Sequence, residues 1–130
     1  MKVLALDYGS ARTGVAVSDP TGTLARPLGV VERAGSESGL AELARLVREE
    51  NAARIVVGLP LTLRGTRGEQ AAETERFVAA LRGIVDLPVE LFDERFTTDL
   101  AQQTAGTAPE DALAAAHLLS TYLEWCAARS

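Results

Sequence analysis

Residues 55–59, Ile-Val-Val-Gly-Leu, form a short apolar run that follows Arg54 and contains no charged side chain. A run of this length and composition is typical of a strand that is buried on both faces of a parallel sheet, so we expect a central strand at 54–59. Parallel strands need crossover connections, which are usually helices. Apolar residues at helical spacing precede the run in 38–50 and follow it at Phe77 and Leu81. The chain is therefore predicted to have an α/β fold.

The remaining apolar segments complete a mixed sheet. Runs at 2–7 and 13–18 flank the turn Gly9-Ser10-Ala11-Arg12 and predict a β-hairpin. We expect a third strand at Val30 and Val31 and a fifth strand at 88–92. Thr66 and Glu69 predict a capping box at the start of the helix between the fourth and fifth strands. A short helix is expected near 98–104, and a last helix from Pro109 to about Ala127. We predict a five-stranded mixed sheet, with strands 1–3 antiparallel and strands 4 and 5 parallel, flanked by helices in one domain spanning 1–130.

Composition narrows the class of protein. The chain has 130 residues, of which 47% are hydrophobic and 24% charged, as is usual for a folded domain. No apolar run approaches the roughly 18 residues of a membrane span, so no membrane partner is expected. The single cysteine, Cys126, cannot form an internal disulfide, which favours a reduced, cytoplasmic location. The net charge of −5 argues mildly against nucleic-acid binding unless positive charge is concentrated locally.

Three carboxylates lie where elements are expected to end or begin. Asp7 ends the first strand, Glu94 follows the fifth, and Asp111 lies in the first turn of the last helix. Carboxylates that converge in this way suit hard cations such as Mg²⁺ or Mn²⁺, and two such ions promote phosphodiester cleavage. Each residue also has a plainer explanation: Asp7 as a strand end, Glu94 as a partner of Arg95, and Asp111 as a helix-start residue.

Several other polar residues are weaker candidates. Asp93 is a possible fourth ligand, but neighbouring residues of a strand face opposite ways. Asp19, before Pro20, is expected to be a turn residue. His117, the single histidine, is expected to pack within its helix, which argues against zinc sites and Ser-His-Asp catalysis. Trp125 is expected to cover the edge of the core, with self-association as the alternative, so we expect a monomer or weak homodimer.

Four stretches in this order resemble the YqgF (RuvX-like) family. They are 4–9 continuing to 12–19 (LALDYG, RTGVAVSD), 54–71 (RIVVGLPLTLRGTRGEQA), 89–98 (VELFDERFTT) and 109–123 (PEDALAAAHLLSTYL). The resemblance implies a ribonuclease H-like fold and a metal-dependent nuclease. The family is described as a Holliday junction resolvase and is linked chiefly to maturation of the 5′ end of pre-16S ribosomal RNA. Its acidic site corresponds to Asp7, Glu94 and Asp111.

The chain departs from the family in one segment. Residues 99–110 are short and contain no lysine or arginine, whereas the family usually carries a longer basic stretch there. Positive charge for the substrate is therefore expected from loop arginines near the active edge, namely Arg12, Arg64, Arg67 and Arg95. Solvated loop charges remain the alternative for each of them.

The nuclease prediction leaves its substrate open, with structured RNA preferred and branched DNA as the alternative. Two other classes compete with it. An actin-like kinase or ATPase also opens with Asp-x-Gly and a hairpin, but needs a second domain, and ATP binding would reveal it. The second competing class is a nucleic-acid-binding module that has the same fold but no catalytic activity. A metal titration would distinguish it, because such a module has no reason to bind two cations.

Overall fold

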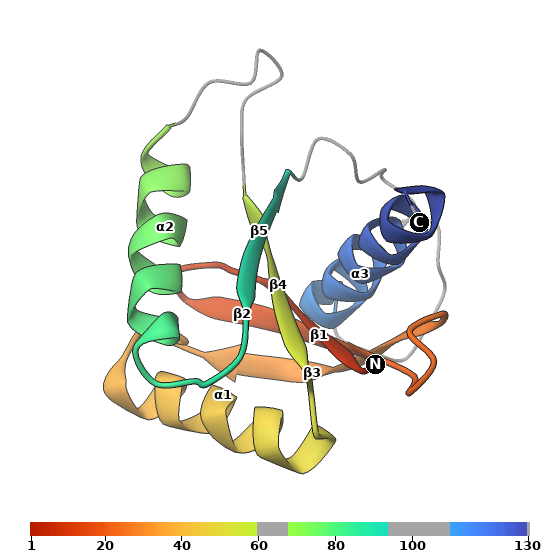
Figure 1. The fold of residues 1–130 in the computed structure, drawn as a ribbon. Helices are drawn as coiled ribbons and strands as arrows, with labels where there is room; N and C mark the ends of the chain where they lie inside the picture. The colour runs from red at the N-terminus through yellow and green to blue at the C-terminus, as the bar shows by residue number, and fades with distance from the viewer. Residues whose placement is uncertain (60–67, 94–109, 130) are drawn as a thin grey trace.

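The computed structural model describes residues 1–59, 68–93 and 110–129. Three strands come first, and helices and strands then alternate, as the sequence predicts (Figure 1). The described elements are β1 (Val3–Asp7), β2 (Arg12–Ser18), β3 (Ala25–Glu32), α1 (Glu37–Glu50), β4 (Arg54–Leu59), α2 (Glu69–Arg82), β5 (Val89–Asp93) and α3 (Glu110–Arg129). The short helix expected near 98–104 lies outside the described residues.

The five strands form one mixed sheet in the order β3-β2-β1-β4-β5. The antiparallel pairs are β1–β2 and β2–β3, whereas β1–β4 and β4–β5 are parallel. This pairing confirms the predicted sheet. Antiparallel neighbours can be joined by short turns, as β1, β2 and β3 are, whereas parallel neighbours need longer crossover connections that contain helices. The carboxyl ends of β1, β4 and β5 consequently lie at one edge of the sheet.

Helices cover both faces of the sheet (Figure 1). Leu4 and Leu6 of β1 belong to the core cluster that includes α1 and α2, whereas Val3 and Ala5 belong to the cluster that includes α3. Side chains of a strand point alternately to the two faces, so β1 contributes to both clusters. A strand buried in this way explains why its sequence is continuously apolar.

Local sequence sets the ends of the first two helices. The Ser36 side chain accepts a hydrogen bond from the Gly39 amide at 3.1 Å, and Asn51 ends α1 at a φ of 55°. Serine at an N-cap and asparagine in the left-handed region are both favourable. The predicted capping box of Thr66 and Glu69 is wrong, because Gly68 is the N-cap and Glu69 the first residue of α2. A capping box needs its glutamate three residues after the cap.

Trp125 covers the edge of the core, as expected. Its ring lies 5.6 Å from that of Phe92 and 6.3 Å from that of Tyr122, measured between centroids. The Arg129 guanidinium lies 4.5 Å above the indole and shields part of it. Within the described ranges, no helix is long and apolar enough to cross a membrane.

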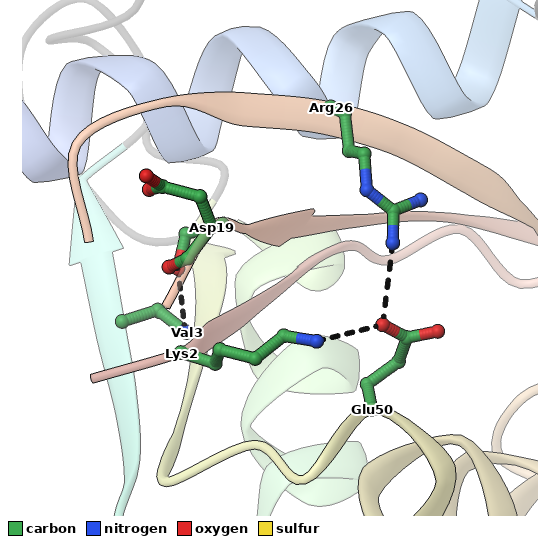
Figure 2. A network of polar contacts seen from close by, with 6 residues as sticks. Lys2, Val3, Asp19, Arg26 and Glu50 are labelled. Carbon is green, nitrogen blue, oxygen red and sulfur yellow. Dashed lines mark hydrogen bonds and ion pairs between the residues drawn. The ribbon is translucent and has the colours of Figure 1, made fainter. Parts of the chain in front are cut away.

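Polar contacts hold the amino end of β1 against α1 and β3 (Figure 2). Glu50, at the end of α1, accepts from Lys2 at 3.1 Å and pairs with Arg26 at 3.4 Å. The Val3 amide donates to Ser18 Oγ at 2.8 Å. Partly exposed ion pairs of this kind contribute at most about 1 kcal/mol each. These contacts lie at the end of β1 opposite Asp7, so they leave the carboxyl edge of the sheet available for chemistry.

Candidate active site

Asp7 lies at the carboxyl end of β1, the central strand of the sheet. It pairs with Gly14 of β2, and the preceding residue, Leu6, pairs with Val57 of β4. Because Ala5 belongs to the core on the α3 side, alternation along the strand places Asp7 on that side too. The carboxylate is thus held by a rigid strand at a partly exposed position.

Asp111 reaches the same place from α3. A Cβ atom on Gly14 would stand 1.8 Å from the carbonyl oxygen of Asp111, so the first turn of α3 rests directly on the β2 backbone. Only glycine permits so close an approach. Since Gly14 is also the strand partner of Asp7, the Asp7 and Asp111 backbones flank one residue. The structure therefore brings the backbones of Asp7 and Asp111, two of the three predicted metal ligands, to either side of Gly14.

Arg12 also reaches this cluster. Its Nε lies 3.3 Å from Asp111 Oδ2, with 65% of the Arg12 side chain and 34% of the Asp111 side chain exposed. A pair this exposed contributes little to stability, since water screens it. Arg12 is predicted to contact phosphate, and in the structure it pairs with Asp111, one of the predicted metal ligands.

The other predicted site residues do not join Asp7 and Asp111 in the part of the chain that the structure describes. Asp93 is the last residue of β5, where it pairs with Leu59, and alternation places it on the side of α1 and α2. Glu94 follows it directly in the sequence but lies outside the described residues, as do Arg64, Arg67 and Arg95.

The chemistry of the donors fits a divalent cation. Carboxylate oxygens are the ligands that Mg²⁺ and Mn²⁺ prefer, and Asp7 and Asp111 could supply two of them. In the described part of the chain, no group of three or more His, Cys, Asp or Glu side chains could hold a metal ion. A complete site thus needs a further ligand, which Glu94 is predicted to supply.

Sequence reasoning did not single out Tyr8, which follows Asp7. Its ring stacks on Phe77 of α2, with centroids 4.4 Å apart and planes 20° from parallel. Burial raises the pKa of the Tyr8 hydroxyl; the charge of Glu73 raises it further, and that of Arg76 opposes the rise. Its position next to Asp7 is the one signal in the sequence that points to this residue.

A second polar group lies at the opposite end of the parallel strands. Arg54, the first residue of β4, donates to the Tyr122 hydroxyl at 2.9 Å and to Glu90 at 3.2 Å. Burial raises the pKa of Tyr122 to about 12, although the hydrogen bond from Arg54 opposes this. The neutral hydroxyl and the charged guanidinium thus form a stable pair, and this group ties β4 and β5 to α3.

The architecture is that of the ribonuclease H-like proteins. The RuvC structure from Thermus thermophilus, solved in complex with a Holliday junction substrate, superposes with a TM-score of 0.62. The superposition covers 97% of this chain and 96% of that one at 17% sequence identity. Similarity at this level of identity establishes the fold alone.

The family follows from closer relatives. The profile of the RuvX family, described as Holliday junction resolvase, matches residues 1–125. A protein of Chloroflexus aggregans is 44% identical, over 94% of this chain and 92% of its own length. One of Rubrobacter xylanophilus is 45% identical, over 95% and 92%. Both are named "Putative pre-16S rRNA nuclease". The chain belongs to the RuvX family, which confirms the resemblance to YqgF (RuvX-like) proteins.

Proposed function

We propose that this protein is a divalent-metal-dependent nuclease that hydrolyses phosphodiester bonds of nucleic acid. The observation that carries the proposal is the contact of Gly14 with Asp111, which places the start of α3 beside Asp7. Membership of the RuvX family supports the same activity.

In this proposal, Asp7, Glu94 and Asp111 hold Mg²⁺ or Mn²⁺. When bound, such ions supply the positive charge that phosphodiester hydrolysis requires. The protein would position both carboxylates: Asp7 pairs with Gly14 at the end of β1, a strand that is paired on both sides up to Leu6, and Asp111 lies where α3 packs closely on β2. Rigid elements of this kind position catalytic groups more precisely than loops do.

We assign substrate binding to four arginines. Arg12 lies beside Asp111, and Arg64, Arg67 and Arg95 belong to the neighbouring sequence segments. Their guanidinium groups suit phosphate oxygens because they donate in a planar fork. Local positive charge of this kind allows a chain with a net charge of −5 to bind a polyanion.

We take the substrate to be structured RNA, in maturation of the 5′ end of pre-16S ribosomal RNA in the cytoplasm. The printed names of the relatives support this choice. Branched DNA is the second candidate, favoured by the description of the family as Holliday junction resolvase. A carboxylate site that acts on phosphate does not itself separate the two.

The test compares cleavage of a pre-16S RNA fragment and a four-way DNA junction in Mg²⁺, in Mn²⁺ and in EDTA. We expect cleavage of the RNA that needs metal and that disappears in Asp111→Asn. Cleavage of the junction alone would favour the resolvase. Cleavage in EDTA, or full activity in Asp111→Asn, would contradict the proposed site.

A further inference from the structure

Arg33 follows β3 in a backbone conformation that residues other than glycine rarely adopt. Its φ is 48°, in the left-handed region, and within the described ranges Asn51 is the only other non-glycine residue with a positive φ. Asparagine is favoured at such a position where it ends α1, whereas arginine has no such advantage and is strained there. Strained residues persist where the surrounding structure holds them, and they gather at functional sites. Arg33 is therefore a candidate functional residue.

The backbone of Arg33 is fixed on both sides. Its amide donates to the Ala11 carbonyl at 2.9 Å, and its carbonyl accepts from the Ser36 amide at 2.9 Å and from the Ser36 hydroxyl at 2.6 Å. A Cβ atom on Gly39 would stand 2.1 Å from the same carbonyl oxygen, so the first turn of α1 rests on it. These contacts involve only the backbone of Arg33, so they hold the residue in place and leave its side chain unused.

The turn that contains Arg33 lies at the carboxyl edge of the sheet. β3 runs in the same direction as β1, since both are antiparallel to β2, so it ends at the edge where Asp7 lies. A Cβ atom on Gly35 would stand 3.5 Å from the Tyr8 hydroxyl, so the turn lies against the residue that follows Asp7. Arg33 therefore projects from the same edge as the proposed metal ligands.

The distance from Arg33 to Asp7 follows from the strand register. Asp7 pairs with Gly14 and Gly14 with Val30, so two strand spacings of about 4.8 Å each separate Asp7 from Val30. Arg33 is three residues further along the chain, which is about 10 Å at the rise of a strand. The α-carbons of Asp7 and Arg33 are then about 14 Å apart, or about four nucleotides along a duplex at about 3.4 Å each. Arg33 is thus placed for a phosphate that flanks the cleaved bond.

The charge of Arg33 is available to an external anion. Its side chain is exposed, and no ion pair in 1–59, 68–93 or 110–129 involves it. Glu32 and Glu37, the acidic residues nearest to it in the sequence, are also exposed and do not pair with it. An arginine on a fixed backbone loses less conformational freedom on binding than one on a mobile loop.

We propose that Arg33 binds a backbone phosphate of the substrate, about two to four nucleotides from the cleaved bond. Its guanidinium donates to the phosphate oxygens as a planar fork. The conformational strain at Arg33 is then the cost of holding this fork at a fixed place on the carboxyl edge. The inference rests on the proposed nuclease function and adds a substrate-binding residue to the four arginines already assigned.

The test measures binding of a pre-16S RNA fragment and of a four-way DNA junction in Ca²⁺ at several salt concentrations. We expect Arg33→Ala to weaken the binding of both by roughly tenfold, because a phosphate contact does not depend on base or sugar. For the junction, whose arms are duplex, the slope of log affinity against log salt should flatten by about 0.9. Arg33→Lys keeps the charge, so it should keep the slope and lose part of the affinity with the fork.

A glycine at position 33 separates binding from folding. Glycine adopts a positive φ without steric cost, so Arg33→Gly should melt no lower than the wild type and still bind as weakly as Arg33→Ala. The matched controls lie at the other end of α1. Asn51→Gly changes the second residue with a positive φ, and Arg48→Ala removes an exposed charge. Both controls should bind the RNA and the junction as the wild type does.

Wild-type affinity and an unchanged salt slope in Arg33→Ala and Arg33→Gly would overturn the inference. An equal loss of affinity in Arg48→Ala would also overturn it, because the effect would then belong to any exposed positive charge. Cleavage in Mg²⁺ is measured separately on the same proteins and on Asp111→Asn. Cleavage that requires Asp111 while Arg33→Ala binds normally would leave the nuclease proposal standing, whereas a wild type that binds but never cleaves would contradict that proposal alone.

Discussion

Gly14 and Asp111 are in backbone contact: any side chain on Gly14 would overlap the carbonyl group of Asp111. The contact joins the second strand of the chain to its last described helix, and the strand partner of Gly14 is Asp7. One glycine thus couples the packing of α3 to the spacing of two carboxylates. Stability and activity should consequently respond together to changes at this position.

Replacing Gly14 with alanine tests that coupling. The new methyl group would force α3 away from β2, so we expect a loss of roughly 1–3 kcal/mol in the free energy of unfolding and a large loss of cleavage. Urea unfolding and a cleavage assay on the same preparation measure both. The matched control is Gly29→Ala in β3, where a Cβ would meet nothing within 4 Å. Similar losses in both variants would mean that the effect belongs to strands in general and not to this contact.

The three carboxylates should act as one unit. Asp7→Asn, Glu94→Gln and Asp111→Asn keep the shape of each side chain and remove its charge, so each should abolish metal-dependent cleavage while leaving the circular dichroism spectrum unchanged. Combining two of them should cost little more than one, because residues that act together are not additive. Wild-type turnover in Glu94→Gln would show that the third ligand is another residue.

Metal binding should stabilise the folded protein, and Arg12 should oppose it. Millimolar Mg²⁺ or Mn²⁺ should raise the melting temperature of the wild type, because the ion binds the native state. Arg12 now pairs with Asp111, so a cation must displace it. We expect Arg12→Gln to bind Mn²⁺ several-fold more tightly in calorimetry and to bind nucleic acid less tightly. The melting temperature of Asp7→Asn should not rise when either metal is added. A wild type whose melting temperature does not change with Mg²⁺ or Mn²⁺ would count against the site.

The loop arginines should appear in the salt dependence of binding. On duplex DNA each phosphate contact contributes about 0.9 to the slope of log affinity against log salt concentration. Replacing Arg64 and Arg67 together with alanine should flatten that slope by roughly one to two units while changing turnover at saturating substrate far less. Binding titrations at several salt concentrations measure it, with Arg48→Ala on α1 as the control. An unchanged slope would mean that both arginines are merely solvated.

The turn at Asp19 should give the protein part of its acid sensitivity. Hydrogen bonds from Thr21 and from the Thr23 and Leu24 amides lower the pKa of Asp19 from 3.8 to about 2. The stabilisation is therefore complete above about pH 4 and is lost as the pH falls through about 2. Asp19→Asn should be less stable than the wild type in urea near neutral pH, and the difference should shrink near pH 2. If the difference in stability between Asp19→Asn and the wild type did not depend on pH, the effect would come from the shape of the side chain and not from its charge.

Much of the fold follows from the sequence because burial leaves a clear pattern. The uncharged run at 55–59 and the apolar run at 2–7 correspond to β4 and β1, which are covered on both faces. The residues at which strands begin and end are harder to predict from the sequence than the presence of the strands. Ala25 to Gly29 belong to β3 although the sequence predicts this strand only at Val30 and Val31, because pairing with β2 extends the strand through Arg26 and Pro27.

The site was only partly predictable for a related reason. Asp7 and Asp111 stand out in the sequence because each carboxylate lies where a strand ends or a helix begins. The requirement for glycine at position 14 depends on a neighbour almost a hundred residues away in the sequence, and no local pattern encodes it. The same holds for the stacking of Tyr8 on Phe77, which forms when α2 packs on the end of β1.

The packing of α3 on β2 also has a consequence for biosynthesis. Asp7 leaves the ribosome early, whereas Asp111 follows roughly 100 residues later, which at about 5–20 residues per second is a delay of about 5–20 s. Throughout that interval the growing chain carries one half of the carboxylate pair without the other. With the proposed site, a nuclease assembled in this order would be inert as a nascent chain, and the translating ribosome, itself built on RNA, would not be exposed to a partly made enzyme that can already cut.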